Sequence, residues 1–217
     1  DIQRSRGLGD VYKRQRFMEY DWNGVPLVIS RTGWSSELGY EIFLRDGASG
    51  SALWDYLMDV GGPMGLKPGH TSSIRRIEAA MLSYHADMTL KNNPFELGMD
   101  RLVDLDMEVD FVSKAALTRI RDEGVSQLQV GLVFDGAPIS GSNDEYWPVL
   151  VDGQKVGQVT SAVYSPRLEQ NIALALVAVA HAGIGTKAMI DMSGEPRGCE
   201  IVQKPFFDPK KAIAAKG

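Results

Sequence analysis

The stretch WPVLVDGQKVGQVTSAV, residues 147–163, decides the fold class of the second half of the chain. Two apolar, β-rich runs, 147–151 and 155–163, flank an Asp-Gly pair at Asp152 and Gly153. An Asp-Gly pair supports a two-residue turn in which both φ angles are positive, and this geometry matches the twist of paired strands. The stretch therefore predicts a tight antiparallel hairpin.

Further short β-rich runs surround this hairpin, with little helical pattern between them. They occupy residues 127–134, 171–180, 187–192 and 199–203. Regularly spaced short strands are typical of a small antiparallel barrel or sandwich. The longest apolar run, residues 172–182, is shorter than the ~18 residues of a membrane-spanning helix and suits a buried strand.

The region before residue 125 has a mixed pattern. Its spacing predicts, in order, a strand at 25–30, a turn at 31–37, a strand at 40–44, a helix at 52–60, a helix from Ser72 or Ser73, and a helix from 113 to 124. Ser113 is expected to be the N-cap of the last helix. The helix from Ser72 or Ser73 is expected to carry an apolar stripe on one face and charges on the other: Ile74, Ile77 and Met81 against Arg75, Arg76 and Glu78.

Glu41 is a single carboxylate between aromatic and aliphatic neighbours on the predicted strand 40–44. In a strand, Tyr40, Ile42 and Leu44 share one face, and Glu41 shares the other with Phe43. Burying a carboxylate is costly unless hydrogen-bond donors pair with it. The residues alone leave two readings: a strand glutamate that points to water, or a carboxylate that receives a ligand's donors.

Composition excludes several classes of protein. The 217 residues carry a net charge of -5, which argues against a general nucleic-acid or anionic-membrane binder. The one cysteine, Cys199, rules out an internal disulfide and any cysteine-cluster metal site. We expect a reducing compartment, the cytoplasm.

Residues 1–16, DIQRSRGLGDVYKRQR, do not follow the pattern of a folded segment. They are basic, have no helical or strand periodicity and lack the apolar core of a signal peptide. They resemble translated adapter sequence, the alternative being a disordered basic arm. We expect a non-native segment and a natural protein that begins further upstream.

No self-contained catalytic or metal-binding motif is present. The three histidines, His70, His85 and His181, lie far apart and in no metal-binding spacing. The sequence has no phosphate-binding loop, no dinucleotide fingerprint after a strand and no GxSxG elbow. No metal site is expected.

Several motifs nevertheless occur together over residues 17–207. They are TGW at 32–34, GYEI at 39–42, GLKPG at 65–69, RIEA at 76–79, NPFELG at 93–98, VGQVTS at 156–161 and PF at 205–206. In this order they resemble the tetrahydrofolate-dependent aminomethyltransferase family, whose founding member is the glycine cleavage T-protein. The resemblance implies an α+β fold, a partial ferredoxin-like middle domain followed by a small antiparallel β-barrel. Together with the change of pattern after residue 124, the resemblance divides the chain into a folate-binding domain at 17–124, a barrel domain at 125–207 and a tail at 208–217, with residues 1–16 outside the fold.

The resemblance implies that tetrahydrofolate is the cofactor and that Glu41 holds its pterin-like ring. A carboxylate can accept two parallel N–H donors from an aminopyrimidine edge, as it does from arginine. Ser72 stands where the T-protein has an arginine six residues before the helix glutamate, Glu78.

Details such as Gly33-Trp34-Ser35 and residues 160–166 are similar to the dimethylsulfoniopropionate demethylase branch. This implies transfer of a sulfonium methyl group to N5 of tetrahydrofolate, largely by positioning the two reactants. Trp34 is the expected substrate-binding residue, through a cation–π contact of ~0.5–2 kcal/mol, or else a packing aromatic. The resemblance leads us to expect a tyrosine two residues after Glu41, but this chain has Phe43 there.

Three other functions stay open. One is aminomethyl transfer in glycine cleavage with a lipoyl carrier protein, and another is the C-terminal part of a sarcosine or dimethylglycine dehydrogenase. The third is a non-catalytic folate-binding protein, a group that carries a Lys-Gly-Cys motif, whereas Cys199 follows Arg197-Gly198. The expected partner is a small-molecule methyl donor. The catalytic residues are expected in an N-terminal half outside this sequence, so this chain alone is expected to be inactive.

Overall fold

The computed structural model describes residues 17–69 and 72–215, in two compact units. Among the described residues, unit 1 comprises residues 17–69, 72 and 211–215, and unit 2 comprises residues 73–210. The segment 1–16, predicted to be non-native, lies outside the described residues. The predicted domain boundary at 124/125 stays a prediction.

Unit 1 contains a three-stranded antiparallel sheet in the order β1-β2-β3. Its strands are β1 (Phe17–Trp22), β2 (Val25–Ser30) and β3 (Glu41–Leu44). β1 was not predicted, although Met18, Tyr20 and Trp22 alternate with acidic residues. Five of its six residues are exposed, so the strand is held by its pairing with β2 and not by a buried face. Asn23 and Gly24 have φ values of 54° and 82° and form the tight turn that pairs Trp22 with Val25.

The predicted helix at 52–60 is confirmed as α2 (Gly50–Gly61), which follows the short 3-10 turn η1 (Gly47–Ser49). It ends where Pro63 enters a second 3-10 turn, η2 (Gly62–Met64). Gly65 then turns the chain with φ 92°, a left-handed conformation that glycine adopts without strain. Unit 1 also holds the short C-terminal helix α5 (Ala212–Ala215).

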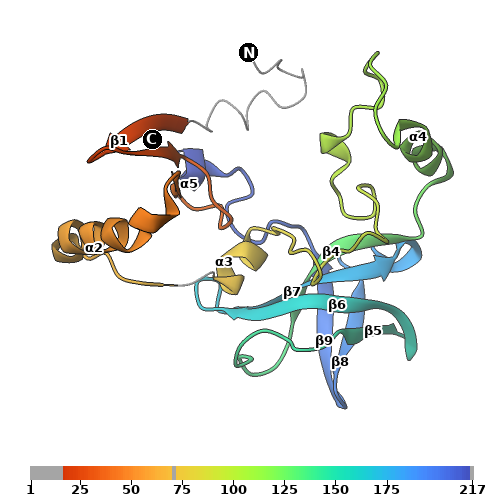
Figure 1. Cartoon of the computed structure of the whole chain (residues 1–217). Helices are drawn as coiled ribbons and strands as arrows, with labels where there is room; N and C mark the ends of the chain where they lie inside the picture. Colours follow the sequence, from red (N-terminus) through yellow and green to blue (C-terminus); the bar gives the residue numbers. More distant parts are fainter. Residues whose placement is uncertain (1–16, 70–71, 216–217) are drawn as a thin grey trace. The chain divides into compact units, whose positions relative to one another are not determined.

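Unit 2 contains a closed six-stranded antiparallel barrel in the order β4-β7-β6-β5-β8-β9 (Figure 1). Its strands are β4 (Gln127–Phe134), β5 (Trp147–Val151), β6 (Gln154–Ser165), β7 (Gln170–Ala178), β8 (Lys187–Met192) and β9 (Glu195–Val202). Because this sheet closes on itself, the fold is the barrel and not the sandwich, the other predicted possibility. The Asp152-Gly153 hairpin is confirmed, with φ values of 50° and 76° and Val151 paired to Gln154.

Two apolar clusters hold unit 2 together. The first fills the barrel with alternate residues of its strands, such as Val130, Leu132 and Phe134 of β4. The second lies outside, where α3 (Ser73–Glu78) packs Ile77 against Val163 of β6 and residues of β7. Figure 1 shows α3 beside these strands. The fold class predicted from sequence, mixed helix and strand followed by an antiparallel barrel, is confirmed.

The predicted helix from Ser72 or Ser73 exists as α3, but the placement of two of its charges was wrong. Arg76 and Glu78 are 6% and 3% exposed and do not form an open polar face, whereas Arg75 is exposed. The helix ends at Glu78, before Met81, and Ala80 adopts φ 54°. Burial is possible because both charged groups find partners far along the chain.

The last helix of the mixed region is α4 (Lys114–Glu123), close to its predicted bounds. Ser113 stands at its N-cap, but with φ 74° and no side-chain cap hydrogen bond. The backbone carbonyl of Ser113 accepts from the Leu117 N–H at 2.9 Å, the first hydrogen bond of the helix. Two 3-10 turns, η3 (Asp100–Leu102) and η4 (Val179–His181), complete unit 2. Among the described helices, none is long and apolar enough to cross a membrane.

Candidate functional site

Glu41 is the first residue of β3, and it pairs across the sheet with Ser30, the last residue of β2. The segment between them, residues 31–40, leaves β2 and returns the chain to the same edge of the sheet. Glu41 is exposed, so its carboxylate is accessible to a ligand. Its two oxygens have about four acceptor positions when ionised.

Two hydroxyl groups adjoin this carboxylate. Thr32 Oγ1 donates a hydrogen bond to Glu41 Oε2, and Ser30 Oγ lies 2.8 Å from Thr32 Oγ1. The structure thus assembles Ser30, Thr32 and Glu41 from the end of one strand, the loop and the start of the next. Neither hydroxyl was predicted as a site residue. Thr32 belongs to the TGW motif, so the motif was the signal that could have found it.

Trp34, the other predicted site residue, lies in the same loop and is 40% exposed. The loop is shaped locally: Ser35 Oγ accepts from the Glu37 N–H at 3.4 Å, and Ser36 adopts φ 54°. The Trp34 indole is therefore partly exposed to solvent. Phe43, at the position of an expected tyrosine, is 54% exposed on β3.

A second polar cluster is buried in unit 2, around Asp87, which is 1% exposed. Asp87 Oδ2 accepts from Arg76 Nη1 at 2.7 Å and from the Ser83 N–H at 2.9 Å, and Asp87 Oδ1 accepts from Thr160 Oγ1 at 2.6 Å. Arg76 Nη2 also donates to Ser161 Oγ at 2.8 Å. This network joins α3 and the following loop to β6. Several residues of the sequence motifs are therefore held in a packing role.

Glu78 forms a neighbouring buried junction. Its Oε1 accepts from Ser165 Oγ at 2.5 Å, and its Oε2 lies 3.7 Å from Arg167 Nη1. Its backbone carbonyl accepts from the N–H groups of Phe206 and Phe207 at 2.9 and 3.0 Å. Glu78 thus ties the end of α3 to the chain that leaves the barrel.

Two groups of unit 2 have shifted pKa values. Burial lowers the pKa of the Lys204 ammonium from 10.5 to about 8, while the Asp87 carboxylate acts in the opposite direction. Burial raises the pKa of the Cys199 thiol to about 11, with a hydrogen bond to the Ala188 backbone opposing the rise and Asp135 adding to it. A thiol with this pKa stays protonated near neutral pH and is a poor nucleophile.

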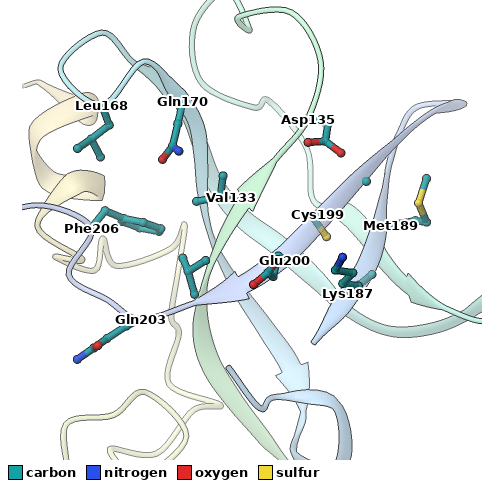
Figure 2. Close-up of a pocket in the computed structure, with 13 residues that line it drawn as sticks. Val133, Asp135, Leu168, Gln170, Lys187, Met189, Cys199, Glu200, Gln203 and Phe206 are labelled. Atoms are coloured by element: carbon teal, nitrogen blue, oxygen red, sulfur yellow. The ribbon is translucent and has the colours of Figure 1, made fainter. Parts of the chain in front are cut away.

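Unit 2 also has an open pocket of about 700 Å³ on the side formed by β4, β8 and β9. Figure 2 shows Asp135, Lys187 and Glu200 at this pocket, with Cys199 and Phe206 among its lining residues. The mixture of scattered charges and apolar side chains shows no nucleophile paired with a base. In the part of the chain that the structure describes, no group of three metal-binding side chains comes together.

Two models of known protein domains match consecutive regions of the chain. The GCVT N-terminal domain model matches residues 10–107, and the glycine cleavage T-protein C-terminal barrel domain model matches residues 128–208. The chain belongs to the glycine cleavage T-protein family. The second matched region corresponds to the closed barrel of unit 2.

Three curated relatives are 35–40% identical to this chain over the aligned residues. An aminomethyltransferase of Symbiobacterium thermophilum is 38% identical over 85% of the chain and 49% of its own length. A dimethylsulfoniopropionate demethylase of Ruegeria pomeroyi is 35% identical over 84% of the chain and 50% of its length. An aminomethyltransferase of Synechococcus sp. strain RCC307 is 40% identical over 85% and 50%. The chain thus spans about half the length of these relatives.

A solved structure shares the fold. The glycine cleavage system aminomethyltransferase T of Bartonella henselae superposes with a TM-score of 0.70 at 21% sequence identity. The match covers 84% of this chain and 50% of that one.

Proposed function

We propose that this chain supplies the folate-binding part of a tetrahydrofolate-dependent one-carbon transferase. The observation that carries the proposal is the accessible Glu41 carboxylate at the start of β3, held by Thr32 within the family's TGW and GYEI motifs. An ionised carboxylate accepts the two parallel N–H donors of an aminopyrimidine edge. The chain spans half the length of its relatives, so we assign Glu41 a binding role and name no catalytic residue.

The donor that we propose is a sulfonium methyl group, as one relative is named a dimethylsulfoniopropionate demethylase. Bound at Glu41, tetrahydrofolate would supply the nitrogen that accepts the methyl group. The donor would leave as a neutral thioether, and the proton displaced from N5 would go to solvent. Trp34, 40% exposed, would hold the cationic sulfur over its indole face.

Aminomethyl transfer is the second candidate. It is favoured by the names of the relatives from Symbiobacterium thermophilum and Synechococcus, both aminomethyltransferases. Under this alternative a lipoyl carrier protein would be the partner. Ser72, at the position of an expected arginine, favours the sulfonium donor. An assay of the complete gene product with tetrahydrofolate and both donor types separates the two candidates.

Glu41→Gln tests the folate site. The amide keeps the shape of the side chain but turns one acceptor into a donor that faces the ligand's N–H groups. We expect tetrahydrofolate to bind about tenfold to a hundredfold more weakly, measured by calorimetry. Glu19→Gln is the matched control, since Glu19 is an exposed carboxylate of the same sheet, paired with Arg45 at 2.7 Å. Equal affinity in the wild type and the Glu41 variant would remove Glu41 from the site.

A further inference from the structure

The hydrogen bonds around Glu41 have a defined direction. An ionised carboxylate can only accept, so the Thr32 hydroxyl must donate its hydrogen to Glu41 Oε2. The Thr32 oxygen is then free to accept, and Ser30 Oγ at 2.8 Å is placed to donate to it. Ser30, Thr32 and Glu41 thus form a hydroxyl chain that ends on the carboxylate.

Ser30 and Glu41, the two ends of this row of hydrogen-bonded groups, both belong to strands of the sheet. Ser30 and Glu41 are register partners on β2 and β3, and Thr32 follows Ser30 by two residues. An exposed glutamate otherwise loses rotamer freedom only when its ligand binds, and this loss of side-chain entropy weakens binding. A side chain already oriented by Thr32 avoids part of that cost.

We propose that Thr32, supported by Ser30, is a positioning residue that orients the Glu41 carboxylate for a ligand with two parallel N–H donors. Thr32 occupies one acceptor position of Oε2, which leaves one on Oε2 and those of Oε1 for the ligand. The inference rests on the proposed function, because it assumes that Glu41 receives the folate ring.

Thr32→Val tests the proposal, because valine keeps the branched shape and removes only the hydroxyl. In the full chain we expect tetrahydrofolate affinity to fall about threefold to tenfold, the effect of one net hydrogen bond. Thr32→Ser should restore the affinity. Ser35→Ala is the matched control, since it removes a hydroxyl of the same loop that bonds to the Glu37 N–H. Wild-type affinity in Thr32→Val would overturn the proposal.

A double-mutant cycle separates positioning from a structural role. If Thr32 acts through Glu41, Thr32→Val adds no further loss of affinity in a Glu41→Gln background. The melting temperature of Thr32→Val should match that of the wild type, because the bond lies on an exposed carboxylate. An equal loss in both backgrounds, or a lower melting temperature that accounts for the loss, contradicts a positioning role.

The same experiment distinguishes this inference from the proposed function. If Glu41→Gln leaves folate affinity unchanged, the folate site itself is wrong. If Glu41→Gln weakens binding while Thr32→Val does not, the folate site stands and the positioning role of Thr32 is wrong.

Discussion

At the residue scale, the two candidate site residues and the buried charges differ in how they are stabilised. Glu41 is exposed and contacts a hydroxyl, whereas Asp87 is buried and accepts three hydrogen bonds of 2.6–2.9 Å. A buried charge requires such pairing, and an exposed one does not. Glu41 therefore retains free acceptor positions, and Asp87 is committed to the fold.

Lys204 gives a residue-scale prediction about pH. Its pKa is lowered to about 8 in the folded protein from an ordinary 10.5, so the unfolded chain binds more protons between these values. The free energy of unfolding should therefore increase as the pH rises from about 8 to 10.5, by at most about 3 kcal/mol from this group. Below pH 8 the buried charge destabilises the fold by a constant amount.

Lys204→Met removes this titrating group and isolates its effect. Urea unfolding at several pH values should show the wild type gaining stability relative to the variant as pH rises from 8 toward 10.5. Other groups titrate in both proteins and cancel in the difference. Parallel stability curves for the two proteins would contradict the lowered pKa.

At the element scale, α3 is held to the barrel by a polar network on one side and an apolar cluster on the other. Arg76 reaches Asp87 and Ser161, and Ile77 packs with Val163 of β6. α3 has only six residues, too short to be stable by itself. Its helical state therefore depends on these tertiary contacts.

Asp87→Asn tests that dependence. The amide removes the negative charge that faces Arg76 Nη1 at 2.7 Å, and the Arg76 side chain is only 7% exposed. Removing one partner of a buried ion pair typically costs about 3–5 kcal/mol, and we expect a loss of this order in urea unfolding. The control is Glu19→Gln at the exposed Arg45–Glu19 pair, where the loss should stay below about 1 kcal/mol. Similar losses in both variants would mean that the buried pair contributes little.

At the scale of the whole molecule, the buried core is unevenly divided between the two units. Both apolar clusters and the Asp87 network belong to residues 73–210. In the described part of unit 1, Leu27 is the buried strand residue, while Phe17, Tyr40 and Phe43 are 70%, 64% and 54% exposed. Large exposed aromatic side chains add little to folding free energy.

This division predicts that residues 73–210 fold alone. A protein of these residues should show a cooperative thermal transition and the near-ultraviolet circular dichroism of the buried Trp147. Residues 17–72 alone should show no cooperative transition. A residue 73–210 protein without a cooperative transition would show that the barrel requires unit 1.

The sequence by itself determined the local geometry. The Asp152-Gly153 turn, the alternating strands of the barrel and the helix that ends before Pro63 follow from short-range backbone preferences. The ordered motifs also indicated the family and singled out Glu41 and Trp34, whose roles stay predictions. Ser113 shows the limit of a local rule, because its φ of 74° places its side chain outside capping geometry.

Only the tertiary structure decided where the charges go and how the sheet closes. Arg76 donates to Ser161, which is 85 positions away in the sequence, and Glu78 accepts from Ser165, which is 87 positions away. Thr160 donates to Asp87 over a separation of 73 positions. No helical or strand period encodes such contacts, so the local pattern placed these charges on an open face. Closure of the barrel depends on the pairing of strands far apart in the sequence, such as β4 with β9. The meeting of Thr32 with Glu41 depends on the pairing of β2 with β3. The physical reason is that burial and pairing depend on neighbours in space, whereas periodicity reports only neighbours in sequence.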